Sequence, residues 1–178
     1  AFGAVSAACS VGFLARWQPA GETVPGPGGL GVVLRQLAGF EAPITAWEHH
    51  ILPARVASFR GDLLDQLGSS GRIVWGRLWS AGKTALRSTP ISFFPRDEAE
   101  TGLGFAAPNT AAELSWPARA VEEALATRGA IFADALVRAT GQLPVDIDRG
   151  LAELVALGRI TSDSFAAVRH LMRPAHRR

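Results

Sequence analysis

The chain has 178 residues, of which 48% are hydrophobic and 19% charged, and its formal net charge at pH 7 is +2. This composition excludes an intrinsically disordered chain and predicts a globular protein with one domain or two small ones. A single cysteine, Cys9, excludes an intrachain disulfide and fits a reducing cytoplasm.

The first predicted element is an apolar stretch, AFGAVSAACSVGFLAR, at residues 1–16. No basic segment precedes it and no initiating Met is present, so a secretion signal is not indicated. We expect a core helix here.

Three helices and a β-hairpin are predicted next. The helices lie near Leu30–Ala38, Ile44–Ile51 and Gly61–Ser69, and the β-rich runs RIVWGRLW (72–79) and TALRS (84–88) flank SAGK (80–83). Three helices followed by a hairpin are typical of a winged helix.

Two short motifs in this region imitate nucleotide-binding sites. Gly82-Lys83-Thr84 could close a phosphate loop, but that loop needs a glycine at position 77, which is an arginine, and a following helix. DEAE at 97–100 follows Lys83 by only fourteen residues, too few for a βαβ unit. We therefore expect Gly82-Lys83-Thr84 at the tip of the wing.

The second half repeats this order of elements. Residues 96–115 are rich in small and turn-forming residues and predict a linker. Helices are then expected from Pro117 to Gly129, over 133–140 and from Pro144 to Gly158, with glycine ending each one and RITS (159–162) as a strand.

An internal repeat supports two related units. LDQLGSSGRI from Leu64 matches LAELVALGRI from Leu151, with the leucines, the glycine and Arg-Ile in register. The predicted fold class is mainly α with small β wings (α+β), as tandem winged helices. The expected boundaries are 1–95 for the first domain, 96–115 for the linker and 116–178 for the second domain with a basic tail.

The residues resemble the region of large helicase-related proteins that follows their helicase core. The resemblance covers most of residues 13–171 and is carried by GFEAPITAWEHHILPARV, LLDQLGSSGRIVWGRL, TPISFFPRDE and IFADALVRATGQLPVDIDRGLAELVALGRITSDSFAAVRHL. It implies winged helices beside an ATP-driven superfamily 2 DNA helicase core, and a role in DNA repair. No catalytic or ATPase motif occurs in this segment, so motor activity does not carry over to these residues.

Basic residues are the candidates for nucleic-acid binding, because phosphate contacts dominate such affinity. The sequence pI is near 9.5, and Lys83 is the single lysine. The wing is the preferred surface, since carboxylates at Asp146 and Asp148 flank Arg149 on the last predicted helix. The full predicted set is Lys83, Arg87, Arg77, Arg138, Arg149, Arg159 and Arg169.

Other side chains support competing interpretations. Trp47, Trp75 and Trp79 could stack on bases, but the strand parity shared with Ile73 favours burial of Trp75 and Trp79. Adjacent His49 and His50 diverge on a helix, so we expect no metal and no cofactor. A glycosylase would need a carboxylate, for which the candidates are Glu48, Asp62, Asp65 and Asp163.

The sequence therefore predicts a nucleic-acid-binding accessory segment of a larger DNA helicase. The alternatives are a winged-helix scaffold that binds protein and, third, a glycosylase-like module. The expected partners are single-stranded or duplex DNA, the helicase core of the same parent chain and, in the scaffold alternative, a protein. No membrane partner is expected, and the expected location is cytoplasmic and nucleoid-associated.

Overall fold

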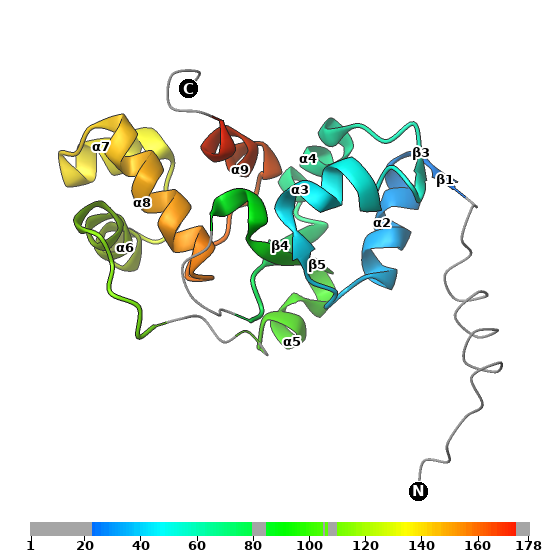
Figure 1. Cartoon of the computed structure of the whole chain (residues 1–178), viewed down its shortest axis with the longest axis horizontal. Coiled ribbons are helices and arrows are strands. Elements are labelled where there is room, and N and C mark those ends of the chain that lie inside the picture. Colours follow the sequence, from blue (N-terminus) through cyan, green and yellow to red (C-terminus); the bar gives the residue numbers. More distant parts are fainter. Residues whose placement is uncertain (1–22, 80–84, 105, 107–109, 174–178) are drawn as a thin grey trace, which may run out of the picture.

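The computed structural model describes residues 23–79, 85–104, 106 and 110–173. The predicted helix at residues 1–16 and the proposed wing tip at Gly82-Lys83-Thr84 lie outside these ranges. The architecture is an α+β winged-helix fold in which α6, α7 and α8 gather at one end and α2, α3 and α4 at the other (Figure 1).

The first part of the described chain contains ten short elements. They are β1 (Val24–Pro25), α2 (Gly26–Gln36), β2 (Ala42–Pro43), α3 (Ile44–Ala46), the π-helical turn η1 (Trp47–Ile51), β3 (Val56–Ala57), α4 (Gly61–Ser69), β4 (Ile73–Gly76), the 3-10 turn η2 (Leu86–Ser88) and β5 (Pro90–Pro95). All three helices predicted here are present, and the bounds of α4 are those expected.

The hairpin differs from the prediction at its second strand. The described part of TALRS, residues 85–88, does not form a strand, because the hydroxyl groups of Ser88 and Thr89 both donate to the carbonyl of Ala85 and close the turn η2. The strand is β5, which pairs antiparallel with β4 from Ile73↔Pro95 to Gly76↔Ser92. β2 adds to the other edge of β5, so the sheet order is β2-β5-β4, while β1 pairs with β3 in parallel.

The second part of the described chain is helical. Its elements are the 3-10 turn η3 (Arg96–Glu98), α5 (Ala99–Gly104), α6 (Trp116–Arg128), α7 (Ala133–Thr140), α8 (Pro144–Ala156) and α9 (Phe165–Met172). The helices predicted after Trp116 are confirmed, and Gly129, Gly141 and Gly158 all adopt positive φ where they end them.

The strand predicted at RITS is wrong. Residues 159–162 carry no strand, and the described part of the second half offers no strand with which they could pair. Instead this segment lies against the three-stranded sheet at β4, where the hydroxyl of Thr161 donates to the carbonyl of Trp75 over 2.6 Å.

Both copies of the internal repeat end their helix in the same way. The amide of Arg72 donates to Leu67 and that of Arg159 to Leu154, at 3.0 and 2.9 Å. The preceding glycines, Gly71 and Gly158, have φ values of 70° and 71°. In each copy of the repeat, the helix therefore ends at a glycine in the left-handed backbone conformation.

Two hydrophobic clusters form the core. The smaller one joins α6, α7 and α8 through Val121, Leu136 and Leu154. The larger one surrounds Trp47 and Phe93 in the first part of the chain, and it also contains Val155 of α8 and two side chains of α9, Phe165 and Val168. The last helix therefore completes the core of the first half.

The predicted linker, 96–115, contains the helix α5 at its start. A side chain at Gly102 would meet the ring of Phe94 at 2.3 Å, so α5 lies directly on β5. The division into units at 1–95, 96–115 and 116–178 stays a prediction. Although α9 lies in the predicted second unit, its side chains pack in the core of the first.

The contact between α6 and α8 depends on Gly150. A methyl group there would meet backbone atoms of Pro117 at 2.9 Å and the amide nitrogen of Ala118 at 3.1 Å. We expect Gly150→Ala to lower the free energy of unfolding by about 1–3 kcal/mol, because the two helices must separate. Urea denaturation monitored by circular dichroism measures this change.

Gly31→Ala is the matched control, because Gly31 is also helical and a methyl group there has no neighbour within 4 Å. It should raise the free energy of unfolding by about 0.5–1 kcal/mol through helix propensity alone. Equal effects of the two substitutions would contradict a packing role for Gly150.

Candidate nucleic-acid interface

One hollow of about 460 Å³ collects basic side chains from three elements. Four of its seven lining residues are arginine or histidine, and we call it the basic hollow. It is lined by Thr45, Glu48 and His49 from α3 and η1, Arg87 from η2, and Arg169, Met172 and Arg173 at the end of α9.

Hydrogen bonds hold the walls of the basic hollow together. The indole of Trp47 donates to the carbonyl of Ile91 over 2.9 Å, which fixes η1 against the sheet. Thr45 donates to the carbonyl of Arg87, and the Arg87 guanidinium donates to the carbonyl of Met172 over 3.1 Å. The turn η2 is therefore tied to both α3 and α9.

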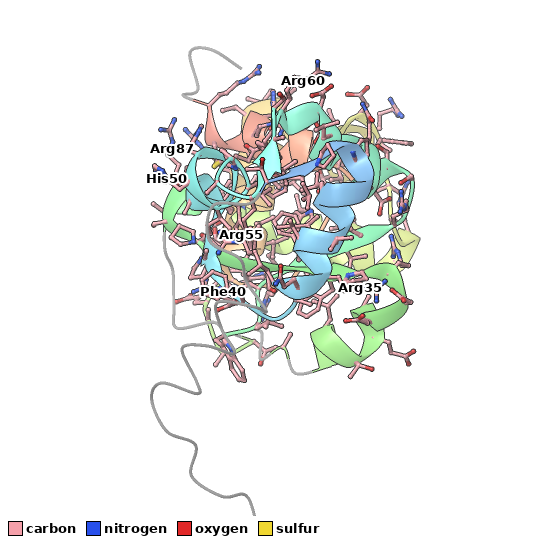
Figure 2. The ribbon with its side chains drawn as sticks, turned by 90° about the vertical axis from the view of Figure 1, so that its right-hand side faces the viewer. Arg35, Phe40, His50, Arg55, Arg60 and Arg87 are labelled. Carbon is pink, nitrogen blue, oxygen red and sulfur yellow. The ribbon has the colours of Figure 1, made fainter. Side chains whose placement is uncertain are left out.

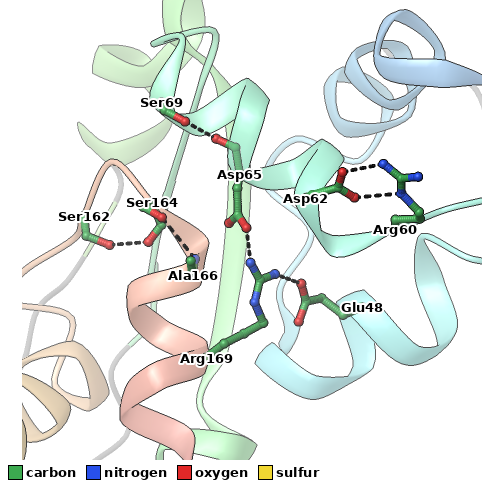
Figure 3. A network of polar contacts seen from close by, with 9 residues as sticks. All are labelled: Glu48, Arg60, Asp62, Asp65, Ser69, Ser162, Ser164, Ala166 and Arg169. Atoms are coloured by element: carbon green, nitrogen blue, oxygen red, sulfur yellow. Dashed lines mark hydrogen bonds and ion pairs between the residues drawn. The ribbon is translucent and has the colours of Figure 1, made fainter.

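Arg169 is the centre of an ion network between the two halves of the chain. Its guanidinium donates to Glu48 of η1 and to Asp65 of α4 (Figure 3). Gly61 leaves room for this contact, because a side chain there would meet the guanidinium at 2.7 Å. Arg169 was predicted to contact DNA, but in this arrangement two carboxylates neutralise it.

Two further predicted cations also have internal partners. Arg77 is 4% exposed and donates to the carbonyls of Ala156 and Trp79. Burial lowers the pKa of Arg77, and the nearby carboxylate of Glu41 opposes that shift. Arg159 forms an ion pair with Glu122 at 2.8 Å. These guanidinium groups connect helices and loops, so neither faces solvent as a phosphate ligand would.

The remaining predicted cations are dispersed. Arg138 is exposed on α7, and Arg149 is exposed on α8 beside Asp146 at 3.3 Å. Lys83 lies outside the described residues. Of the seven predicted cations, the described structure brings only Arg87 and Arg169 together at the basic hollow.

Sequence reasoning missed His49 and Arg173 as members of this site. Arg173 belongs to the basic segment RHLMRPAHRR, so local charge density was an available signal for it. His49 was considered only as a metal ligand. Its place in the basic hollow depends on η2 and α9, which lie 38 and more residues away in the sequence.

The third helix of each unit presents no basic face. Asp62, Gln66 and Ser69 are exposed along α4. On α8, Asp146 pairs with Arg149, and Asp148 lies 3.5 Å from His170 of α9. A helix that reads the major groove would carry donors and cations on such a face. Among the described residues, basic side chains therefore gather at the basic hollow rather than on these two helices.

The tryptophans divide into buried and exposed groups. Burial of Trp75 is confirmed, and Trp47 is fully buried. The predicted burial of Trp79 is wrong, because β4 ends at Gly76 and the alternation of the strand no longer applies to residue 79. The indole of Trp79 is 60% exposed.

The comparisons with known proteins identify the family. Residues 5–96 match the model of the winged-helix domain of the large helicase-related protein. The chain belongs to the large helicase-related protein family. It is 33% identical over 175 residues to the "Lhr helicase/ probable uracil glycosylase" of Mycolicibacterium smegmatis, and 31% identical over 153 residues to the "Lhr helicase/uracil glycosylase" of Escherichia coli.

The matches cover most of this chain but little of the relatives. They span 93% and 79% of the chain, yet only 11% and 9% of the two large helicase-related proteins. The sequence thus corresponds to one winged-helix region of a much longer family member. Of the helices that the structure describes, none combines the length and apolarity that a membrane span requires.

The carboxylates considered for glycosylase chemistry are held by arginines. Glu48 and Asp65 bind Arg169, and Asp163 lies 4.0 Å from Arg96. The hydrogen bond from Arg60 lowers the pKa of Asp62. Within the described ranges, no group of three or more histidine, cysteine or acidic side chains is placed to hold a metal ion.

The ion network at Arg169 should contribute to stability. We expect Arg169→Met to lower the free energy of unfolding by about 1–3 kcal/mol, because two partly buried carboxylates would lose their counterion. Arg149→Met removes an exposed ion pair on α8 and should change the free energy of unfolding by about 0.5 kcal/mol or less. Urea denaturation of both variants tests this, and equal effects would contradict a special role for Arg169.

Proposed function

We propose that this chain is a nucleic-acid-binding accessory segment of a larger ATP-dependent DNA helicase that acts in DNA repair. The observation that carries the proposal is the gathering of basic side chains around the basic hollow. Membership of the large helicase-related protein family supports the context. The helicase core would belong to the same parent chain, and the cytoplasmic, nucleoid-associated location is part of the proposal.

The charges of the basic hollow favour a phosphate backbone. Arg169 with Glu48 and Asp65 carries a formal charge of −1, while Arg87 and Arg173 each add a positive charge on the same walls. His49 adds a further positive charge when protonated. Arginine forms bidentate hydrogen bonds with phosphate, so two arginines beside an open hollow can track a strand.

The acidic third helices argue against base-specific readout. Phosphate contacts position a protein on nucleic acid, whereas sequence is read by side chains that reach base edges. On α4 the exposed Asp62 is acidic, and on α8 the exposed Arg149 is paired with Asp146. We therefore expect binding that depends strongly on salt and weakly on sequence.

Cation removal at the basic hollow should weaken this binding. We expect Arg87→Ala with Arg173→Ala to flatten the slope of log affinity against log salt concentration by about one to two, because two phosphate contacts are lost. Fluorescence anisotropy with labelled single-stranded and duplex DNA over a salt series measures the slope. Adding Lys83→Ala tests the predicted contribution of the wing.

Arg60→Ala with Arg149→Ala is the control, because it removes the same charge from two exposed ion pairs elsewhere. This control should leave the slope nearly unchanged. A slope that falls equally in both double variants would assign the binding to net charge and contradict a role for the basic hollow. The prediction for Arg149 is tested by the same series, and that for Arg138 stays a prediction.

A second candidate function comes from the names of the relatives, both of which include uracil glycosylase. In this chain Asp65 is the best-placed carboxylate, since its second oxygen is buried without a hydrogen-bond partner among the described atoms. A carboxylate near the sugar can support loss of a flipped base. The protein-binding scaffold, which the sequence favours over the glycosylase, is the other alternative for the same winged helices.

Under the main proposal the chain releases no uracil from DNA. Incubation with a uracil-containing oligonucleotide, followed by alkaline cleavage and gel electrophoresis, measures release. Uracil release that Asp65→Asn abolishes would support the glycosylase, provided that circular dichroism of the variant is unchanged. Glu48→Gln serves as the matched variant, because it also removes a carboxylate that binds Arg169.

A further inference from the structure

Trp79 is an exposed aromatic side chain on a restrained backbone. Its indole is 60% exposed, whereas Trp47 and Trp75 are buried. Large apolar side chains are usually removed from water, so an exposed indole is informative when the chain around it is fixed.

Hydrogen bonds on both sides hold the backbone of residue 79. The carboxylate of Glu41 accepts from the amides of Leu78 and Trp79, the latter over 3.2 Å. The carbonyl of Trp79 accepts from the Nε of Arg77 over 3.1 Å, and the same guanidinium donates to Ala156 of α8. Leu78 is buried between these contacts. The indole is thus presented at a defined position.

A second exposed aromatic ring lies close to this position. Phe40 is 52% exposed and directly precedes Glu41, whose carboxylate binds the amide of Trp79. One edge of Phe40 rests on Trp47, with ring centroids 6.0 Å apart. Phe40 and Arg87 lie toward the same side of the molecule in Figure 2, on which η1 also presents His50.

We propose that Trp79 is a stacking site for an unpaired nucleobase, with Phe40, the residue before Glu41, as a second exposed ring. This inference rests on the proposed function, because it extends the path of a strand whose phosphates contact Arg87 at the basic hollow. Every base has a flat π-face, so an exposed indole on a fixed backbone fits a single strand without sequence preference. A protein partner would need a wider apolar surface than two separate rings provide.

The distinguishing experiment compares two strands that differ only in their bases. The full 178-residue chain is titrated with labelled oligothymidine and with an abasic phosphodiester of equal length, using fluorescence anisotropy. Stacking requires a base whereas phosphate contacts do not, so the protein should prefer oligothymidine by about tenfold. Trp79→Ala should reduce that preference to about twofold or less, and Trp79→Phe should retain part of it.

Trp116→Ala is the matched control, because Trp116 is 68% exposed on α6 and distant in sequence from the basic hollow. It should keep the full preference for bases. Unchanged thermal unfolding of Trp79→Ala would confirm that the ring is not part of the core.

The outcomes separate the stacking site from the proposed function. If Arg87→Ala with Arg173→Ala weakens both strands equally while Trp79→Ala leaves the preference intact, the stacking site is wrong and nucleic-acid binding stands. If the unmodified chain binds neither strand, the stacking site is wrong, and if it also fails to bind duplex DNA, both proposals fail. Equal affinity of the unmodified chain for the two strands would also overturn stacking, and would point to a protein surface over Trp79.

Discussion

The arrangement depends on one ion network, in which Arg169 of α9 pairs with both Glu48 of η1 and Asp65 of α4. Glu48 and Asp65 lie 121 and 104 residues before Arg169 in the chain, so these contacts join the end of the described chain to its first half. Without the guanidinium, two partly buried carboxylates would repel each other and oppose docking of α9. The far wall of the basic hollow consists of α9, which this network helps to hold against η1 and α4.

Local chemistry made the helices predictable. Gly71 and Gly158 adopt the left-handed conformation that ends a helix, and Pro144 occupies a first-turn position where its missing amide costs nothing. Such preferences act within a few residues, so the bounds of α4 and α7 follow from the sequence. The hairpin was less predictable, because the hydroxyls of Ser88 and Thr89 favour a turn where β-rich residues indicated a strand.

The sequence gives the charge of each arginine but not the partner that the fold places beside it, so it could not separate exposed arginines from internally paired ones. Arg87 has no carboxylate close to it in sequence, and it lines the basic hollow, while its contact with nucleic acid stays a prediction. Arg77 and Arg159 find partners 79 and 37 residues away, and composition carries no information about such pairs. The same limit explains Trp79, whose exposure follows from the end of β4 and from hydrogen bonds to residues on both sides of the sheet.

In the described residues, only the first copy of the internal repeat is followed by a sheet. In the second unit the segment after Gly158 lies against β4 through Thr161, and Phe165 and Val168 of α9 enter the first core. Separating the halves would expose these side chains to water, at a cost of about 1.5–3 kcal/mol for each large one. Because the halves are joined in this way, a strand bound at the basic hollow under the proposed function would contact η1 and η2 of the first half and α9 of the second. Nucleic-acid binding and docking of α9 are then coupled, since a ligand that contacts both halves stabilises only the docked arrangement.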